Sequence, residues 1–289
     1  DDLARVKEIV ATSAAQAAVL NADDPHCRAM AARLGGGAEL IWFSMDADND
    51  TVRAHLASGG RALLHDDGAV VIASGASREV LVAVRDIPCT LDGRASYNIA
   101  NSLAAAAALT GAGFSPTDIA AGLASFVSDA RSNPLRTNVF QVGGLTLVID
   151  YAHNAAACTA LAQMARALAP GTVVGVVTAP GDRRDEELRS TGRACGAGFD
   201  RVVVYESLGR GRQYGATAAL IRAGALETSR DPRCVEGVDD RLLALRRALA
   251  ICKPGDVMVY CGTSAEPMVE ALRQLDAEAA RELARQIGT

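Results

Sequence analysis

The stretch VIDYAHNAAACTAL, residues 148–161, decides the fold, because an apolar run ends there in a polar cluster and a helical pattern follows at once. Asp150, His153 and Asn154 crowd the end of the predicted strand. Ligands of open α/β sheets bind outside the carboxyl ends of the strands. The stretch therefore predicts a strand–helix unit with a candidate binding site at the end of its strand.

The same alternation continues to the end of the chain. Strands are predicted at 145–150, 173–178, 200–206 and 256–262, and helices at 155–168, 184–197, 215–225, 239–251 and 264–285. Buried Val-rich strands that alternate with helices form a parallel sheet covered on both faces. We therefore expect an α/β domain with a mostly parallel sheet over residues 134–289.

Residues 1–133 show a different α/β pattern. A helix is followed by the strand AAVLNADD, a helix at 25–34 and the strand ELIWFS; residues 51–95 then favour β-hairpins, with DDG as a turn signal. Residues 97–126 are predicted to be helical, with Ser115 as an N-cap. The polar segment VSDARSNPLRTN sets the domain boundary near residue 133. Because the chain opens on a helix and an interior strand, we expect it to start in the middle of a domain.

Composition narrows the classes of function. The 289 residues are 49% hydrophobic, which suffices for two buried cores, and the formal net charge of -5 argues against nucleic acid as a partner. The seven cysteines are scattered without a CxxC pair, so a zinc site has little support and a reducing cytoplasm is expected. No apolar run is long enough to span a bilayer, so no membrane partner is expected.

Two arginine-bearing loops follow predicted strands at the same sheet edge as Asp150. APGDRRDE, residues 179–186, contains Asp182 and Arg183, and ESLGRGR, residues 206–212, contains Arg210 and Arg212. Guanidinium groups offer planar paired donors to a carboxylate or phosphate. The alternatives are a capped helix with exposed arginines in the first loop and solvated charges in the second.

Other polar residues suggest a nucleotide. Asp150 can accept hydrogen bonds from ribose hydroxyls, whereas His153 could be a ligand, a proton carrier or a helix-start residue. Asn98 and Asn101 lie on one face of a predicted helix, and their amides match the edge of adenine, although Asn98 could simply cap the helix. Arg136 at the domain junction could reach a bound phosphate or be a surface charge.

A phosphate cradle is missing from the sequence. It contains neither G-x-x-x-x-G-K-[ST] nor a G-x-G-x-x-G that opens a helix after a strand. The chain thus offers apparent groups for adenine, ribose and anions but none for the triphosphate. On sequence physics alone, Lys7 is an ordinary exposed helix lysine.

Six motifs in this order resemble the cyanophycin synthetase branch of the Mur ligase family over almost the whole chain. They are AVLNADDP, YNIANSLAAA, ARSNPLRTNVF, DYAHNAAA, APGDRRDEEL and RGRQYG. The resemblance implies part of a Mur ligase central ATPase domain, without its P-loop, at residues 1–133, and a Rossmann-like C-terminal lid domain at 134–289. It also implies an ATP- and Mg²⁺-dependent amide ligase that acts through an acyl phosphate.

The resemblance assigns further roles. In the cyanophycin branch, arginine is joined to the aspartate side chains of poly-aspartate, so an amino acid and an acidic acceptor are the implied substrates; a homo-oligomer is compatible with this assignment. Asn98 and Asn101 would face adenine, Arg136 the ATP phosphates and Asp150 the ribose. Lys7 matches the lysine that many Mur ligases carbamylate to help hold a second Mg²⁺.

The implied substrate side of the site lies at the arginine loops. By the resemblance, His153 would be catalytic there, with Asp182, Arg183, Arg210 and Arg212 as substrate-binding residues.

Departures from the family pattern leave two alternatives open. Tyr97 replaces a common histidine, Ala155 a proline and Leu135 a glycine, and the P-loop that belongs upstream of Lys7 is not in the sequence. The first alternative is a stand-alone binding or assembly module without catalysis. The second is a ligase of the peptidoglycan or folylpolyglutamate type with a different acceptor.

Overall fold

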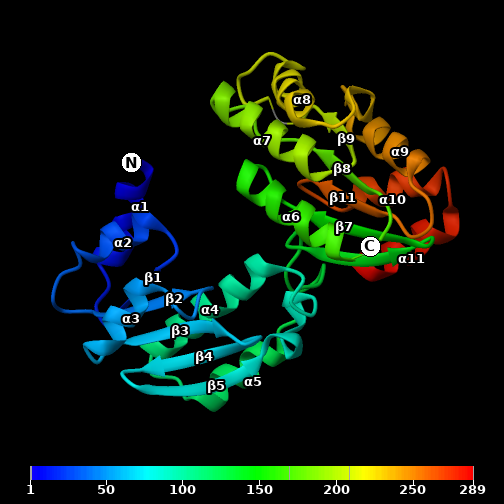
Figure 1. The fold of residues 1–289 in the computed structure, drawn as a ribbon. Helices are drawn as coiled ribbons and strands as arrows, with labels where there is room; N and C mark the ends of the chain where they lie inside the picture. Colours follow the sequence, from blue (N-terminus) through cyan, green and yellow to red (C-terminus); the bar gives the residue numbers. More distant parts are fainter. Residues whose placement is uncertain (1, 169, 208, 289) are drawn as a thin grey trace. The chain divides into compact units, whose positions relative to one another are not determined.

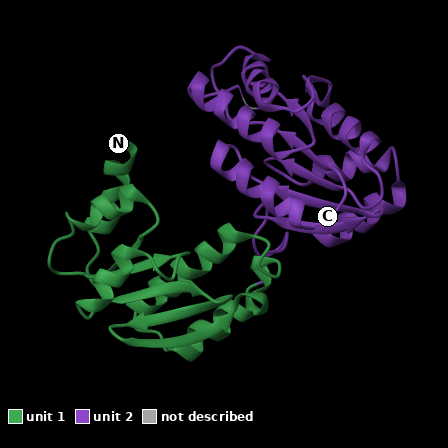
Figure 2. Ribbon diagram, in the orientation of Figure 1, with its two compact units in different colours: residues 1–126 green, residues 127–289 purple. Residues whose placement is uncertain are grey.

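Two compact units, residues 1–126 and 127–289, make up the chain (Figure 2). The structure is a computed structural model that describes residues 2–168, 170–207 and 209–288. The units divide between Phe126 and Val127, somewhat before the predicted boundary near residue 133. The intervening segment belongs to the second unit, where the Ser128 hydroxyl donates to the carbonyl oxygen of Arg136 at 2.7 Å.

The first unit contains a five-stranded mixed sheet (Figure 1). Its order is β1 (Ala17–Asn21), β2 (Glu39–Ser44), β3 (Arg61–Asp66), β4 (Ala69–Ser74) and β5 (Ser77–Ala83). The first three strands are parallel, whereas β4 is antiparallel to both β3 and β5. The predicted hairpin at DDG is confirmed, because Asp67 and Gly68 take the positive φ values of 45° and 72° that tight hairpin turns require.

Helices cover both faces of this sheet. They are α1 (Asp2–Thr12), α2 (Pro25–Ala31), α3 (Asp50–Ala57), α4 (Ser96–Gly111) and α5 (Pro116–Ser125), with 3₁₀ turns at Val84–Asp86 and Pro88–Thr90. Ile41 packs into the core that α4 and α5 share, while its neighbour Trp42 packs into the core on the α2 and α3 side. Successive strand residues face opposite sides, so one strand serves both cores.

The helix α3 corrects the expectation of hairpins throughout residues 51–95. The Asn49 side chain accepts hydrogen bonds from the backbone N–H groups of Thr51 and Val52, which starts a helix there. Val52 and Leu56 are four residues apart and both are buried against the sheet. The N-cap at Asn49 and the helical spacing of Val52 and Leu56 therefore make this segment a helix, although the alternating β pattern begins soon after it.

The second unit is built on a six-stranded sheet in the order β10-β9-β8-β11-β7-β6. The strands are β6 (Asn138–Val142), β7 (Leu145–Asp150), β8 (Val173–Val177), β9 (Arg201–Tyr205), β10 (Val235–Val238) and β11 (Val257–Cys261). All neighbours are parallel except the antiparallel edge pair β6 and β7. The four predicted strands and the mostly parallel sheet are confirmed; β6 and β10 are additional.

The helices of the second unit also match the predicted alternation. They are α6 (Ala155–Leu168), α7 (Asp185–Gly198), α8 (Ala216–Thr228), α9 (Arg241–Ile251), α10 (Glu266–Arg273) and α11 (Ala277–Ile287), with a 3₁₀ turn at Pro232–Cys234. The last predicted helix, 264–285, is thus two helices. Asp276 causes the break, because its Oδ1 accepts hydrogen bonds from the backbone N–H groups of Glu278 and Ala279 and begins α11.

The helices α7 and α8 approach each other closely because glycines face the contact. A Cβ atom at Gly192 would overlap the carbonyl oxygen of Ile221, and one at Gly224 would overlap that of Arg189. This helix layer therefore depends on the absence of side chains at these positions.

Candidate functional site

Four strands of the second sheet end beside one another and bring the predicted loops together. A small pocket at this edge is lined by Tyr151, Ala152, His153, Thr178, Ala179, Pro180, Ser207, Arg210, Cys261, Gly262 and Thr263. These residues follow β7, β8, β9 and β11, so the expectation that the three polar loops meet is confirmed. Residue 208 of the ESLGRGR loop lies outside the described residues.

Asp150 is tied into the protein rather than presented to solvent. It is only 9% exposed, and its Oδ2 accepts hydrogen bonds from the backbone N–H of Thr137 at 2.7 Å and from the Thr137 hydroxyl at 3.2 Å. Burial raises the pKa of Asp150, while the hydrogen bonds from Thr137 and Ala152 and the positive charge of Arg136 act in the opposite direction. Asp150 therefore fixes the turn that contains Arg136.

That turn has an unusual backbone. Leu135 and Thr137, which flank Arg136, have φ values of 60° and 54°, in the left-handed region that favours glycine. The Tyr151 N–H donates to the Leu135 carbonyl oxygen at 2.9 Å, which adds a second tie beside that of Asp150. The left-handed conformation means that glycine would fit the position of Leu135 with less backbone strain than leucine does.

Arg136 lies over an aromatic ring. Its Cζ is 5.8 Å from the centroid of the Tyr151 ring, and among the described residues its side chain makes no hydrogen bond or ion pair. The ring of His153 packs on the same tyrosine at 5.1 Å between centroids. His153 Nδ1 is 2.9 Å from the Tyr151 carbonyl oxygen, which fits a proton on Nδ1 and leaves Nε2 as the available nitrogen.

Arg212 joins the two arginine loops. Its Nε donates to the carbonyl oxygen of Gly181 at 3.0 Å, and its two terminal nitrogens reach Asp185 Oδ1 at 2.8 Å and the Arg183 carbonyl oxygen at 2.7 Å. All three guanidinium nitrogens are thus engaged within the protein. Arg212 is neither the solvated charge nor the free anion ligand considered above, but a clamp that sets the shape of the first loop.

The other loop residues are more open. Arg210 pairs with Asp182 at 2.9 Å, and this partner lowers the pKa of the Asp182 carboxyl group. The Arg183 side chain has no hydrogen bond or ion pair within the described part of the chain. It lines a pocket of about 300 Å³ together with His153 and Asn154, whose side chain caps α6. Arg183 and His153 are therefore two of the available polar groups on this side of the loops, and Ser190 also lines the pocket.

The remaining predicted residues belong to the first unit. Asn98 Nδ2 donates to the Cys89 carbonyl oxygen at 2.7 Å, and Asn98 Oδ1 accepts from Asn101 Nδ2 at 3.2 Å. Asn98 does not cap α4 with its side chain, because the N-cap residue is Ala95. Asn101 is exposed. Lys7 is exposed on α1, as its sequence environment suggests.

Replacement of Asp150 by alanine should lower the free energy of unfolding by about 2 kcal/mol, because the buried Thr137 N–H loses its acceptor. Asp150→Asn, which keeps an acceptor oxygen, should cost less. Urea unfolding of both variants measures the difference. Equal losses would show that the hydrogen bond to Thr137 is unimportant.

The raised pKa of Asp150 also predicts how the stability of the chain depends on pH. The folded chain binds this proton more tightly than the unfolded chain does. The associated stability is therefore complete below the unfolded pKa of about 3.9 and is lost as the pH rises through the folded pKa. Relative to Asp150→Asn, the wild-type chain should lose stability over that window in urea unfolding measured as a function of pH. A constant difference would contradict the assignment.

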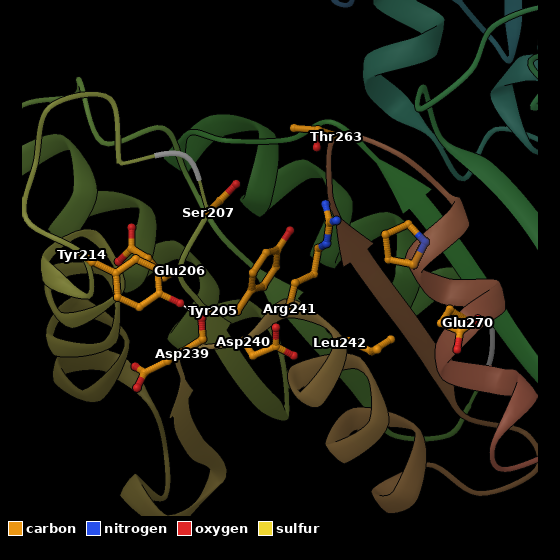
Figure 3. A pocket seen from close by; sticks show the side chains of 11 residues that line it. Tyr205, Glu206, Ser207, Tyr214, Asp239, Asp240, Arg241, Leu242, Thr263 and Glu270 are labelled. Carbon is orange, nitrogen blue, oxygen red and sulfur yellow. Dashed lines mark hydrogen bonds between the residues drawn. The ribbon is translucent and has the colours of Figure 1, made fainter.

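A larger pocket of about 500 Å³ lies next to the loops and contains residues that the sequence did not single out (Figure 3). It is lined by Tyr205, Glu206, Ser207, Tyr214, Asp239, Asp240, Arg241, Leu242, Thr263, Pro267 and Glu270. The signal that could have found them is the rule used for the other loops, since Glu206 and Asp239 directly follow the strands β9 and β10.

Comparisons with known proteins identify this fold. Residues 135–264 match the family model described as "Mur ligase, glutamate ligase domain", so this part of the chain is similar to that family. Solved structures agree at the level of the fold. A folylpolyglutamate synthase/dihydrofolate synthase from Yersinia pestis, complexed with AMPPNP and Mn ion, has a TM-score of 0.61 at 21% identity and covers 95% of this chain and 56% of its own.

A MurF ligase from Thermotoga maritima in complex with ADP gives a similar result. Its TM-score is 0.57 at 17% identity, with 97% of this chain and 58% of the ligase covered.

The curated relatives of the chain include cyanophycin synthetases. The enzyme of Trichormus variabilis is 34% identical over 276 residues, which cover 94% of this chain and 30% of the relative. That of Crocosphaera subtropica is 36% identical over 264 residues, covering 90% of this chain and 30% of the relative. The resemblance to this branch is thus confirmed, and the chain spans under a third of the length of these relatives.

Proposed function

We propose that this chain is part of an ATP-dependent ligase that forms amide bonds on an amino-acid polymer, as its resemblance to the cyanophycin branch implies. The observation that supports this most is the identity of 34% over 94% of the chain. Residues 1–133 would be part of the central ATPase domain and residues 134–289 the C-terminal lid domain. The relatives support the coarser class, an ATP-dependent acid–amino-acid ligase, independently of the substrate.

The proposed reaction has two steps. A carboxylate oxygen of the acceptor attacks the γ-phosphorus of ATP, which gives an acyl phosphate and ADP. The amine of the incoming amino acid then attacks the acyl carbon, the acyl C–O bond breaks, and inorganic phosphate leaves as the amine loses a proton. In the cyanophycin version the acceptor is an aspartate side chain of poly-aspartate and the amine belongs to arginine.

The residues of the second unit fit an anion better than a ribose. Arg136 has a guanidinium group without an ion pair in the described residues, which suits a phosphate oxygen. The ribose role considered for Asp150 is poorly supported, because Oδ2 already accepts two hydrogen bonds from Thr137. We infer that Asp150 acts as a positioning residue, which holds the turn that presents Arg136.

The adenine and magnesium roles receive unequal support. Asn101 is exposed and its Oδ1 has no hydrogen bond within the described residues, so it remains a candidate for adenine, whereas both amide atoms of Asn98 are engaged. The described residues contain no group of three or more His, Cys, Asp or Glu side chains arranged to hold a metal ion. Lys7 is therefore not part of a cluster of metal-ligating side chains among the described residues.

The substrate side of the site would be built by the arginine loops. Arg183 and His153 line a pocket at the start of α6, and Arg210, paired with Asp182, lines the neighbouring one. We propose that Arg183 binds a carboxylate of the acidic acceptor and that His153 Nε2 faces the reacting groups. Arg212 would act only through its hold on the loop.

A ligation assay on the natural protein that contains this chain tests the proposal. Arginine with poly-aspartate, a murein-type peptide with its amino acid, and a folate with glutamate would each be incubated with ATP and Mg²⁺. Release of phosphate together with a gain in product mass is expected only for arginine with poly-aspartate. Product from another pair would overturn the acceptor assignment, and no product from any pair would favour the non-catalytic module.

A further inference from the structure

The pocket of about 500 Å³ beside the arginine loops is rich in carboxylates (Figure 3). Glu206, Asp239, Asp240 and Glu270 line it, and the one basic residue in its lining is Arg241. These residues come from the ends of β9 and β10 and from α9 and α10. Its size falls within the range of small-molecule sites, roughly 300–1,000 Å³.

Glu206 distinguishes this pocket from a solvated acidic surface. Its side chain is 5% exposed, and Oε2 accepts a hydrogen bond from the backbone N–H of Ala218 at 3.0 Å. Oε1 is buried and has no hydrogen-bond partner within the described residues. A buried carboxylate oxygen without a partner is costly, and a cationic ligand would remove that cost.

The other acids of the pocket differ in how far they are engaged. Asp240 caps α9 through a hydrogen bond from the Leu243 N–H at 2.8 Å, and Glu270 pairs with Arg273 at 3.2 Å. The Asp239 side chain is exposed and makes no hydrogen bond or ion pair in the described part of the chain. Glu206, through its buried Oε1, and the exposed Asp239 are therefore the two carboxylates of the pocket that have unpaired oxygens among the described residues.

Arg241 supplies the opposite charge. It is the first residue of α9 and makes no ion pair with any described residue. In Figure 3 its side chain runs beside the ring of Tyr205 toward Thr263, away from Glu206. The pocket lining thus contains two carboxylates with unpaired oxygens, and one guanidinium group that points away from Glu206.

We propose that this pocket binds a basic amino acid, with the side-chain cation at Glu206 and Asp239 and the α-carboxylate at Arg241. The proposal rests on the proposed function and deepens it, because it assigns the incoming amino acid to named residues. A guanidinium or ammonium group donates several charge-assisted hydrogen bonds, which suits the free oxygen of Glu206. An acidic or neutral amino acid would leave that oxygen unpaired.

Calorimetric titration of the full 289-residue chain without ATP tests the proposal. L-Arginine and L-lysine should bind in the millimolar range or tighter, and L-glutamate should not. Agmatine, which has the guanidinium but no carboxylate, should bind at least tenfold more weakly than arginine. Absence of arginine binding, or equal binding of glutamate, would overturn the proposal.

Two variants locate the binding. Glu206→Gln should weaken arginine binding at least tenfold, whereas Glu278→Gln, an exposed residue of α11, removes the same charge and should leave it unchanged. Arg241→Gln should remove the preference for arginine over agmatine. Equal effects of Glu206→Gln and Glu278→Gln would reject the site.

Thermal unfolding tests whether the Glu206→Gln variant is correctly folded. The midpoint should not fall, because the variant removes a buried charge and keeps an acceptor oxygen for Ala218. If this variant fails to fold, Asp239→Asn provides the same binding test, with weaker arginine binding expected and unchanged binding contradicting the proposal. Because titration needs no ATP, failure here with intact ligation of arginine would reject the pocket alone.

Discussion

Replacement of Arg136 by alanine in the natural protein that contains this chain is expected to lower the rate of ATP-driven ligation by about 100-fold or more. Loss of one preorganised donor to developing charge in an active site typically costs ~10²–10³ in rate. Arg136 fits that role because its guanidinium has no ion pair within the described residues and is held over Tyr151 by the Asp150 turn. Initial rates at saturating ATP measure the effect.

Two controls separate this role from a structural one. Arg136→Lys keeps the charge but loses the planar pair of donors, so it should recover only part of the rate. Arg131→Ala removes an arginine from the same segment and should leave the rate unchanged. A rate for Arg136→Ala within about threefold of the wild type, which is less than ~1 kcal/mol of barrier, would remove Arg136 from the site.

The second large effect concerns the fold. Gly192→Ala should lower the free energy of unfolding by about 3 kcal/mol, because its Cβ would overlap the carbonyl oxygen of Ile221 and force α7 and α8 apart. Backbone cannot yield as the end of a flexible side chain can. Urea unfolding of the chain measures the loss.

A matched substitution gives the opposite sign. Gly122 lies inside α5, and a Cβ there would meet nothing within 4 Å. Gly122→Ala should therefore stabilise the chain by about 0.5–1 kcal/mol through helix propensity. A similar loss at both glycines would mean that close packing between α7 and α8 does not govern the cost.

The arrangement of the second sheet was predictable because it follows from local pattern and general topology. Apolar runs followed by helical periodicity indicate parallel strands, and parallel strands place their carboxyl ends at one edge. This rule is sufficient to predict that the DYAHN loop lies beside the loops that contain Pro180 and Arg210. The strand β6 escaped prediction, and with it the partnership between Asp150 and Thr137, which depends on the antiparallel pairing of β6 with β7.

The roles of individual polar side chains were less predictable, because they depend on partners distant in sequence. Arg212 looks like an anion ligand in the sequence, yet its nitrogens bind Gly181, Arg183 and Asp185 about one strand and helix earlier in the chain. Glu206 looks like the polar end of a strand, and only its burial with one unpartnered oxygen makes it a candidate ligand. The sequence pattern predicts the sheet edge at which polar side chains gather. It does not predict which of these side chains already have hydrogen-bond partners within the protein.

The most direct test of the central claim follows an oxygen atom. The acceptor would carry a heavy oxygen isotope in its side-chain carboxylates, and the natural protein would ligate arginine to it with ATP. If the carboxylate attacks the γ-phosphorus, one labelled oxygen leaves with each phosphate released, and mass spectrometry of the phosphate detects it. Phosphate without label, alongside amide product, would contradict an acyl phosphate and with it the proposed ligase mechanism.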